Sequence, residues 1–206
     1  MKKDMTILYP LGNNLYVNMT NRCPYNCTFC LRQTMDTVSK ENPHSLWLER
    51  EPSVQEVCNE FKKFDMDQYN EIVFCGFGEP TERLYDIFEV CDCIKTTYNK
   101  PIRINTNGSA NLIWQKDTTK DFKDRIDTVS ISLNHPDPVQ YQNIVRSKFG
   151  IQSHKAMLEF AKNVKQYVKH VCMTTVDTTI SHEDEKQCAL ICKELGVSYR
   201  IRPYEK

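Results

Sequence analysis

The chain has 206 residues, and its 27 Lys plus Arg balance 27 Asp plus Glu, so the formal net charge is zero. This length suits one full-sized domain, and the balanced charge lacks the basic excess of most duplex nucleic-acid binders. No apolar run approaches the roughly 18 residues that span a membrane, and no apolar stretch follows the lysines of residues 1–10. We therefore expect a cytoplasmic protein with no membrane partner and no nucleic-acid signature.

Short runs rich in β-branched and aromatic residues alternate with helical patterns along the chain. The predicted strands lie at residues 15–20, 71–75, 102–106, 128–133, 170–176 and 198–202. The predicted helices begin with a capping-box pattern at Ser53, continue at 84–94, within 111–125 and at 153–166, and end at 188–195 before Gly196.

This alternation predicts an α/β domain with a parallel sheet, either open and doubly wound or curled into a partial barrel. In both arrangements functional residues gather where the strands end at their carboxyl side. The long polar stretch 31–52 is either a mobile flap over that site or a surface loop.

Three of the ten cysteines, Cys23, Cys27 and Cys30, lie on the loop after the first predicted strand. Thiolates at this spacing can hold one face of an iron–sulfur cluster. Three ligands would leave one iron of a four-iron cluster open to a chelating ligand. Two alternatives remain at this point: a chance spacing, and a zinc site completed by a fourth ligand such as His44.

Polar residues also follow the next three predicted strands. Gly76-Phe77-Gly78-Glu79-Pro80 follows the second, where the glycines let the backbone approach a ligand closely and Glu79 offers a carboxylate to an ammonium group. Thr106-Asn107-Gly108 follows the third, and Ser132 and Asn134 lie at the end of the fourth. Taken alone, the first two segments are also common turns, and a buried serine or asparagine needs only some hydrogen-bond partner.

Taken together, these segments resemble the radical S-adenosylmethionine (radical SAM) superfamily, whose hallmark is a Cys-x-x-x-Cys-x-x-Cys loop with an aromatic residue before the third cysteine, here Phe29. The chain is most similar to the TatD-associated radical SAM proteins, which share its length, its Phe-Cys-Gly-x-Gly-Glu-Pro segment and an ending like residues 198–204. The resemblance implies a partial (β/α)6 TIM-like barrel. It also implies a single core domain over 1–206 with its cluster loop at 21–30 and no auxiliary domain.

The resemblance further implies a [4Fe-4S] cluster on the three cysteines and S-adenosylmethionine (SAM) at its open iron. It assigns Phe29 to the SAM adenine and Glu79 to the SAM amino group. The remaining expected SAM contacts are Gly76, Gly78, Asn107, Ser132 and Asn134. The chain departs from the family pattern at Phe77, where many members have glycine, and at Asn134, where they have aspartate.

The implied reaction takes an electron from a flavodoxin or ferredoxin and cleaves SAM to methionine and a 5′-deoxyadenosyl radical. That radical abstracts hydrogen from a substrate that the sequence does not name: a small molecule, a peptide or a protein. The rival hypothesis is a non-catalytic iron–sulfur or zinc sensor or scaffold, which would not need Glu79 or Ser132.

A few residues stay outside this assignment. Cys75 is a weak candidate for a catalytic role, and Thr106 and Arg202 are candidates for contact with an anion or substrate. Arg200 and Arg202 share one strand face, with pairing to Asp177 or Glu79, or exposure to solvent, as the alternative. We expect Cys58, Cys91, Cys188 and Cys192 in the core, and leave Cys93 and Cys172 unassigned.

Overall fold

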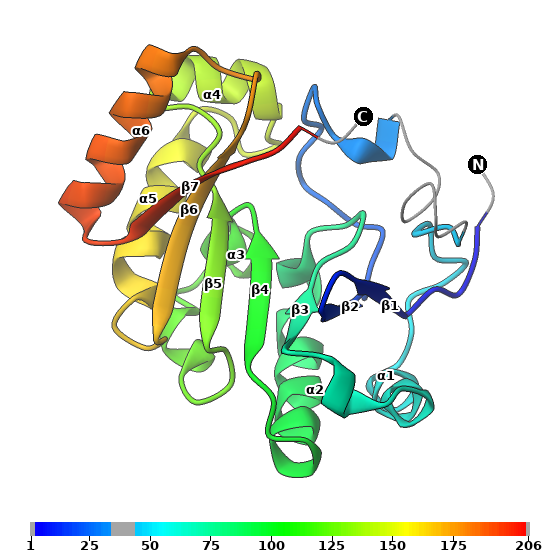
Figure 1. The fold of residues 1–206 in the computed structure, drawn as a ribbon. Coiled ribbons are helices and arrows are strands. Elements are labelled where there is room, and N and C mark those ends of the chain that lie inside the picture. The colour runs from blue at the N-terminus through cyan, green and yellow to red at the C-terminus, as the bar shows by residue number, and fades with distance from the viewer. Residues whose placement is uncertain (1–2, 34–43, 205–206) are drawn as a thin grey trace.

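The computed structural model describes residues 3–33 and 44–204. Within them one sheet has seven strands in the spatial order β1 to β7 (Figure 1). The strands are β1 (Leu8–Leu11), β2 (Asn14–Val17), β3 (Glu71–Phe74), β4 (Ile102–Thr106), β5 (Thr128–Ser132), β6 (His170–Val176) and β7 (Ser198–Arg202). All neighbours from β2 to β7 pair in parallel. The predicted α/β fold is therefore confirmed, and an open, partial TIM-like barrel is compatible with it.

The six predicted strands correspond to β2 to β7, and the antiparallel strand β1 is an addition that was not predicted. β1 pairs antiparallel with β2 from Leu8 opposite Val17 to Leu11 opposite Asn14. Only Gly12 and Asn13 join the two strands, and Gly12 has a φ of 57°. Glycine adopts that left-handed conformation without a Cβ clash, so this dipeptide was the signal for a hairpin.

Helices fill the connections between the parallel strands. They are α1 (Val54–Glu60), α2 (Leu84–Thr97), α3 (Ala110–Trp114), α4 (Pro138–Val145), α5 (Gln152–Val164) and α6 (His182–Leu195). The predicted capping box at Ser53 is present, and Gly196 ends α6. Helix α4 was not predicted, although the Asp137 side chain caps it and Pro138 occupies its first turn. Within the described residues, no helix is long and apolar enough to cross a membrane.

The two faces of the sheet differ in chemistry. One face carries Ile72, Ile104, Ile131 and Met173, all fully buried in one core with residues of the helices. Each such side chain contributes roughly 1.5–3 kcal/mol by burial. The residues between them in each strand point to the opposite face of the sheet, which we call the helix-free face. Figure 1 shows the helices on one side of the sheet and this second side toward the viewer. Its side chains include Arg103, Asn105, Ser130, Cys172 and Arg200.

Candidate active site

The predicted site residues lie on neighbouring segments of the fold. The cysteine loop follows β2, Gly76–Pro80 follows β3, Asn107 follows β4 and Asn134 lies just beyond β5. These four strands are adjacent and parallel. Their carboxyl ends therefore meet at one edge of the sheet, as the sequence analysis expected.

Backbone hydrogen bonds fix the cysteine loop to the end of α4. The amides of Asn26 and Thr28 donate to the carbonyls of Val145 and Ile144, at 3.1 and 2.9 Å. The amide of Lys148 donates in return to the carbonyl of Pro24, at 2.9 Å. The helix that sequence analysis missed therefore positions the cysteines. Its only sequence signals were the Asp-Pro start and the helical spacing of apolar Tyr141 and Val145.

The three cysteines of this loop are half-buried free thiols. The pKa of Cys23 and the pKa of Cys27 are both raised to about 12, mainly by burial. The charge of Glu79 contributes to the rise at Cys23, and the charge of the Cys30 thiolate contributes at both. Arg32 acts in the opposite direction on the pKa of Cys23 and Cys27. Thiols in this setting lose their protons when a metal replaces them.

The described cysteines do not form a site for a single metal ion. In residues 3–33 and 44–204, no three His, Cys, Asp or Glu side chains are close enough to hold one ion. His44, the candidate fourth zinc ligand, contacts Asp4 at 3.2 Å. The described residues therefore show no preassembled site for a single metal ion.

The segment after β3 lies directly against the cysteine loop. The amide of Glu79 donates to the carbonyl of Arg22 at 2.8 Å. A Cβ at Gly78 would collide with the carbonyl oxygens of Thr20 and Arg22, and one at Gly76 would collide with the Asn18 amide. The space beside both glycines is thus filled by protein. Direct contact of these glycines with a ligand stays a prediction.

The carboxylate of Glu79 is buried at the centre of a hydrogen-bond network. Its Oε1 accepts from the Thr106 hydroxyl at 2.6 Å and from the hydroxyl and amide of Thr81 at 2.7 and 3.1 Å. Its Oε2 accepts from the Asn107 amide at 2.8 Å. Burial raises the pKa of Glu79, while these donors lower it. No described Lys or Arg forms an ion pair with Glu79, so a ligand ammonium at Oε2 would supply the missing counter-charge.

Besides Oδ1 of Asn18, which faces Gly76, two buried amide atoms at this edge have no hydrogen-bond partner among the described residues. They are Nδ2 of Asn107 and Oδ1 of Asn134. Oδ1 of Asn107 accepts from the amide and hydroxyl of Ser109, which fixes Nδ2 as the remaining donor. Asn134 has a φ of 61°, a conformation that Asn tolerates better than most residues. An unpaired buried polar atom costs about 1–3 kcal/mol, so one unpaired donor and one unpaired acceptor fit a polar ligand such as SAM.

The other predicted site residues are placed as follows. Ser132 is the last residue of β5, half-buried and opposite Thr174 of β6. Phe29 is half-buried in the cysteine loop. The Thr106 hydroxyl is committed to Glu79 and to the amide of Gly108, at 2.6 and 3.0 Å. The carbonyl of Arg202 accepts from the Asp177 amide at 2.8 Å. Burial raises the pKa of Cys75, while Asn105 and the charges of Arg202 and Arg103 lower it.

Sequence analysis missed the segment that braces the site from the other side. The Asn21 side chain pairs with the backbone of Leu48 through bonds of 2.8 and 3.0 Å. The Asn18 amide donates to the carbonyl of Leu46 at 2.8 Å, and the Thr20 hydroxyl donates to Glu51 at 2.5 Å. Residues 44–52 therefore lie fastened beside the cysteine loop. Residues 34–43 lie outside the described part, so a flap over 31–52 stays a prediction.

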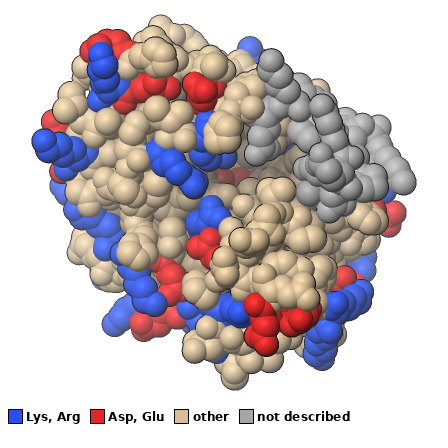
Figure 2. Space-filling model, viewed as in Figure 1, with Lys and Arg blue, Asp and Glu red and all other residues tan. Residues whose placement is uncertain are grey.

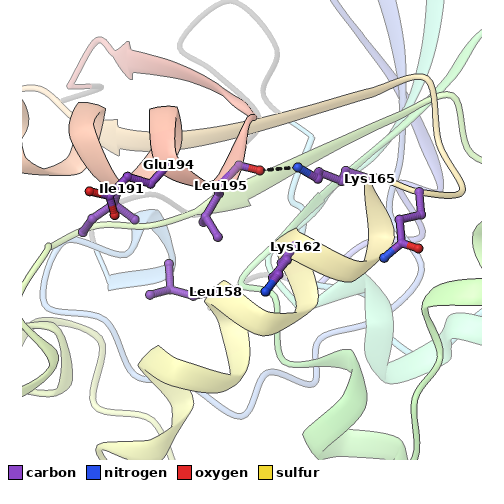
Figure 3. Close-up of a pocket in the computed structure, with 7 residues that line it drawn as sticks. Leu158, Lys162, Lys165, Ile191, Glu194 and Leu195 are labelled. Carbon is purple, nitrogen blue, oxygen red and sulfur yellow. Dashed lines mark hydrogen bonds between the residues drawn. The ribbon is translucent and has the colours of Figure 1, made fainter.

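A separate hollow of about 460 Å³ lies on the helix-covered side, between α5 and α6. Figure 3 shows Leu158 and Lys162 of α5 facing Ile191 and Leu195 of α6, with Lys165 donating to the carbonyl of Leu195. None of the residues that line this groove belongs to the segments after β2, β3, β4 or β5 that carry the predicted site. It therefore takes no part in the candidate active site.

Comparison with known proteins places the chain in a family. The sequence profile of the Radical SAM superfamily matches residues 17–195. The protein therefore belongs to the radical SAM superfamily, whose members are enzymes that use a [4Fe-4S] cluster and SAM. This confirms the predicted class and cofactors. No curated protein sequence matches the chain significantly.

Solved radical SAM structures share the fold at low sequence identity. SuiB of Streptococcus suis bound to its precursor peptide SuiA is 17% identical, with a TM-score of 0.67 over 94% of this chain and 39% of that chain. A radical SAM methyltransferase from Sphaerobacter thermophilus is 14% identical, with a TM-score of 0.65 over 95% and 57%. The protein anSMEcpe with bound AdoMet is 15% identical, with a TM-score of 0.63 over 93% and 51%. The chain thus spans between 39% and 57% of these proteins.

Proposed function

We propose that this protein holds a [4Fe-4S] cluster on Cys23, Cys27 and Cys30 and binds SAM between that cluster and Glu79. The observation that carries the proposal is the 2.8 Å bond from the Glu79 amide to the Arg22 carbonyl, which places a buried carboxylate without a described counter-ion beside the cysteine loop. When bound, the cluster and SAM supply reductive cleavage to methionine and a 5′-deoxyadenosyl radical that takes hydrogen from a substrate.

The chain's own residues bind and orient these groups. Glu79 accepts a hydrogen bond from the SAM ammonium at Oε2, and Thr106 holds the carboxylate in place through Oε1. The unpaired amide atoms of Asn107 and Asn134 take polar groups of SAM. Additional SAM contacts come from Ser132, from the backbone of Gly76 and Gly78, and from Phe29 against the adenine.

Two residues of the helix-free face are proposed for the substrate. Arg202 binds a carboxylate or phosphate, either of SAM or of an anionic substrate, near the end of β7, and its charge also acts on Cys75. Cys75 lies at the carboxyl end of β3, one residue before the Gly76–Pro80 segment. This position makes it a candidate to touch the substrate.

The wider assignment follows the same proposal. The electron donor is a flavodoxin or ferredoxin, the compartment is the cytoplasm, and the protein is one of the TatD-associated radical SAM proteins. Residues 1–206 form one radical SAM core domain. The substrate is a small molecule, a peptide or a protein. The similar fold of SuiB bound to a precursor peptide keeps a peptide among these candidates.

The test is anaerobic reconstitution followed by reduction in the presence of SAM. We expect about four irons per chain and release of 5′-deoxyadenosine. We also expect a broad absorbance band at about 400 nm, which thiolate-ligated iron–sulfur clusters show. Cys30→Ala should lose iron and product together. Cys93→Ala is the matched control, because Cys93 is half-buried on α2, away from the cysteine loop.

Two results would contradict the proposal. Stoichiometric zinc without iron after reconstitution would show a zinc site. A stable iron–sulfur cluster that binds no SAM and yields no 5′-deoxyadenosine would support the rival hypothesis of a sensor or scaffold.

A further inference from the structure

A cavity of about 380 Å³ opens on the helix-free face of the sheet. We call it the Arg200 pocket, and it is lined by Asn14, Glu71, Arg103, Thr128, Ser130, Cys172 and Arg200. These residues come from the six parallel strands β2 to β7, which lie side by side in the sheet. Figure 2, viewed from this side, shows Lys and Arg atoms beside Asp and Glu atoms near the centre of the face.

The Arg200 pocket carries a net positive charge. Arg103 is neutralised by Glu71, whose Oε2 lies 2.8 Å from the Arg103 Nε. The Arg103 guanidinium also donates to the Asn105 side-chain oxygen at 3.2 Å, so two partners fix its position. Arg200 forms no ion pair with any carboxylate in the described part of the chain. The charges of Arg103 and Glu71 cancel, which leaves the Arg200 guanidinium as the uncompensated charge.

Uncommitted polar side chains line the same cavity. The side chains of Asn14, Thr128 and Ser130 make no hydrogen bond with another described residue. Ser130 is buried, yet its hydroxyl is not among the sealed atoms without a partner, so it reaches the cavity. Hydroxyl and amide donors beside a guanidinium are the groups that bind anionic oxygens.

The position of the pocket separates it from the SAM site. Ser130 lies two residues before Ser132 on β5, and Thr128 lies four residues before it. A strand rises about 3.3 Å per residue, so the pocket begins roughly 7 Å below the strand ends where SAM binds. A group in this pocket therefore lies on the same face of the sheet as Ser132, deeper along the strands.

We infer that the Arg200 pocket binds the anionic group, a carboxylate or a phosphate, of the substrate. This inference rests on the proposed function, because it makes the ligand the molecule that meets the SAM-derived radical. The planar guanidinium of Arg200 pairs with two oxygens of the anion. Ser130 and Thr128 donate to the remaining oxygens. Glu71 sets the strength of binding, because its charge repels the anion while it holds Arg103.

The experiment measures binding of simple anions to the whole chain, before and after cluster assembly, by fluorine NMR. The probes are 4-fluorophenyl phosphate and 4-fluorobenzoate, which share a ring and differ in the anion. We expect one of them to bind to the wild type and Arg200→Ala to weaken that binding about tenfold, which corresponds to one charge-assisted hydrogen-bonding group. The probe that binds more tightly identifies the anion.

Two further variants make the test specific. Glu71→Gln removes a negative charge from the pocket, so it should tighten binding a few-fold, the opposite sign to Arg200→Ala. Arg125→Ala, at a half-buried arginine outside the pocket that pairs with Asp92, should leave anion binding unchanged. Equal affinity in the wild type and Arg200→Ala, or no binding of either probe, would overturn the inference. If the chain assembles no cluster but binds a probe in an Arg200-dependent way, the anion site is supported. The proposed radical SAM function is then refuted.

Discussion

The amide of Glu79 and the carbonyl of Arg22 lie 2.8 Å apart, and this bond joins the loop after β3 to the cysteine loop one residue before Cys23. The proposed ligand for SAM and the proposed ligands for iron are thus parts of one rigid junction. Residues that shape the junction should affect iron and SAM together, whereas residues that touch only SAM should not.

Gly78 is the residue that permits this junction. A Cβ at this position would lie 2.7 Å from the Arg22 carbonyl oxygen and closer still to that of Thr20. Both are backbone atoms that cannot turn away, so we expect Gly78→Ala to cost about 3 kcal/mol and to lower iron content. Chemical denaturation and iron analysis measure the two effects. Gly150→Ala is the control, because nothing lies within 4 Å there and only its φ of 71° is unfavourable. If Gly78→Ala and Gly150→Ala lose the same free energy of unfolding and the same amount of iron, close packing at Gly78 is not what holds the two loops together.

Replacement of Glu79 separates SAM binding from cluster binding. In Glu79→Gln the side-chain oxygen can still accept from Thr106 and Thr81. The substitution removes the negative charge and places an NH2 group opposite the Asn107 amide, which is itself a donor. We expect SAM affinity to fall tenfold or more, since charged hydrogen bonds contribute about 1.5–3 kcal/mol, with iron content intact. Calorimetry on the reconstituted chain gives the affinity. The exposed Glu89→Gln on α2 serves as the control, and an unchanged affinity in Glu79→Gln would refute the assignment.

The unpaired carbonyl of Asn134 offers a cleaner test of SAM contact. Asn134→Gly removes that acceptor, while glycine accepts the φ of 61° without strain. SAM affinity should fall about threefold to tenfold, the value of one neutral hydrogen bond, and the melting temperature should stay near that of the wild type. Asn134→Ala should lose the same affinity and also about 1 kcal/mol of stability from the left-handed backbone. If Asn134→Gly binds SAM as the wild type does, the orphaned atom faces no ligand.

Asp127 holds the opposite ends of the strands, so its replacement should spare the active site. Its carboxylate accepts from Lys95, from Lys169 at 2.7 Å and from the Ile102 amide at 2.9 Å. Burial opposes ionisation, yet these donors hold the pKa of Asp127 below its usual value. We expect Asp127→Asn to lose about 1–3 kcal/mol at pH 7, with unchanged iron and SAM binding.

The pH dependence of this loss has a defined sign. A carboxyl group whose folded pKa is lowered stabilises the protein above its unfolded pKa, about 3.9. That contribution disappears as the pH falls through the folded value. Urea titrations give the free energy of unfolding of the wild type and of Asp127→Asn. The difference between the two should be smaller near about pH 3 than at pH 7. Asp124→Asn, at an exposed neighbour, should have the same free energy of unfolding as the wild type at both pH values.

Much of the fold follows from local pattern. Alternating β-branched runs and capped amphipathic segments determined the parallel strands and five of the helical segments, and the spacing of Cys23, Cys27 and Cys30 determined the cofactor class. These features need only neighbours in sequence: a Ser53 cap acts on Glu56 three residues away, and loop cysteines act as one ligand set because they are adjacent.

Tertiary structure decided what lies around those elements. Val145 and Ile144 of α4 hold the cysteine loop across more than a hundred residues, and Leu46 and Leu48 brace it from the other side. The glycines after β3 make room for the Thr20 and Arg22 backbone, which no single segment reveals. Arg200 appears in the sequence as one charge on a strand face. Only the pairing of Glu71 with Arg103, on two other strands, leaves it as the uncompensated charge of a cavity, because charge balance depends on distances that folding sets.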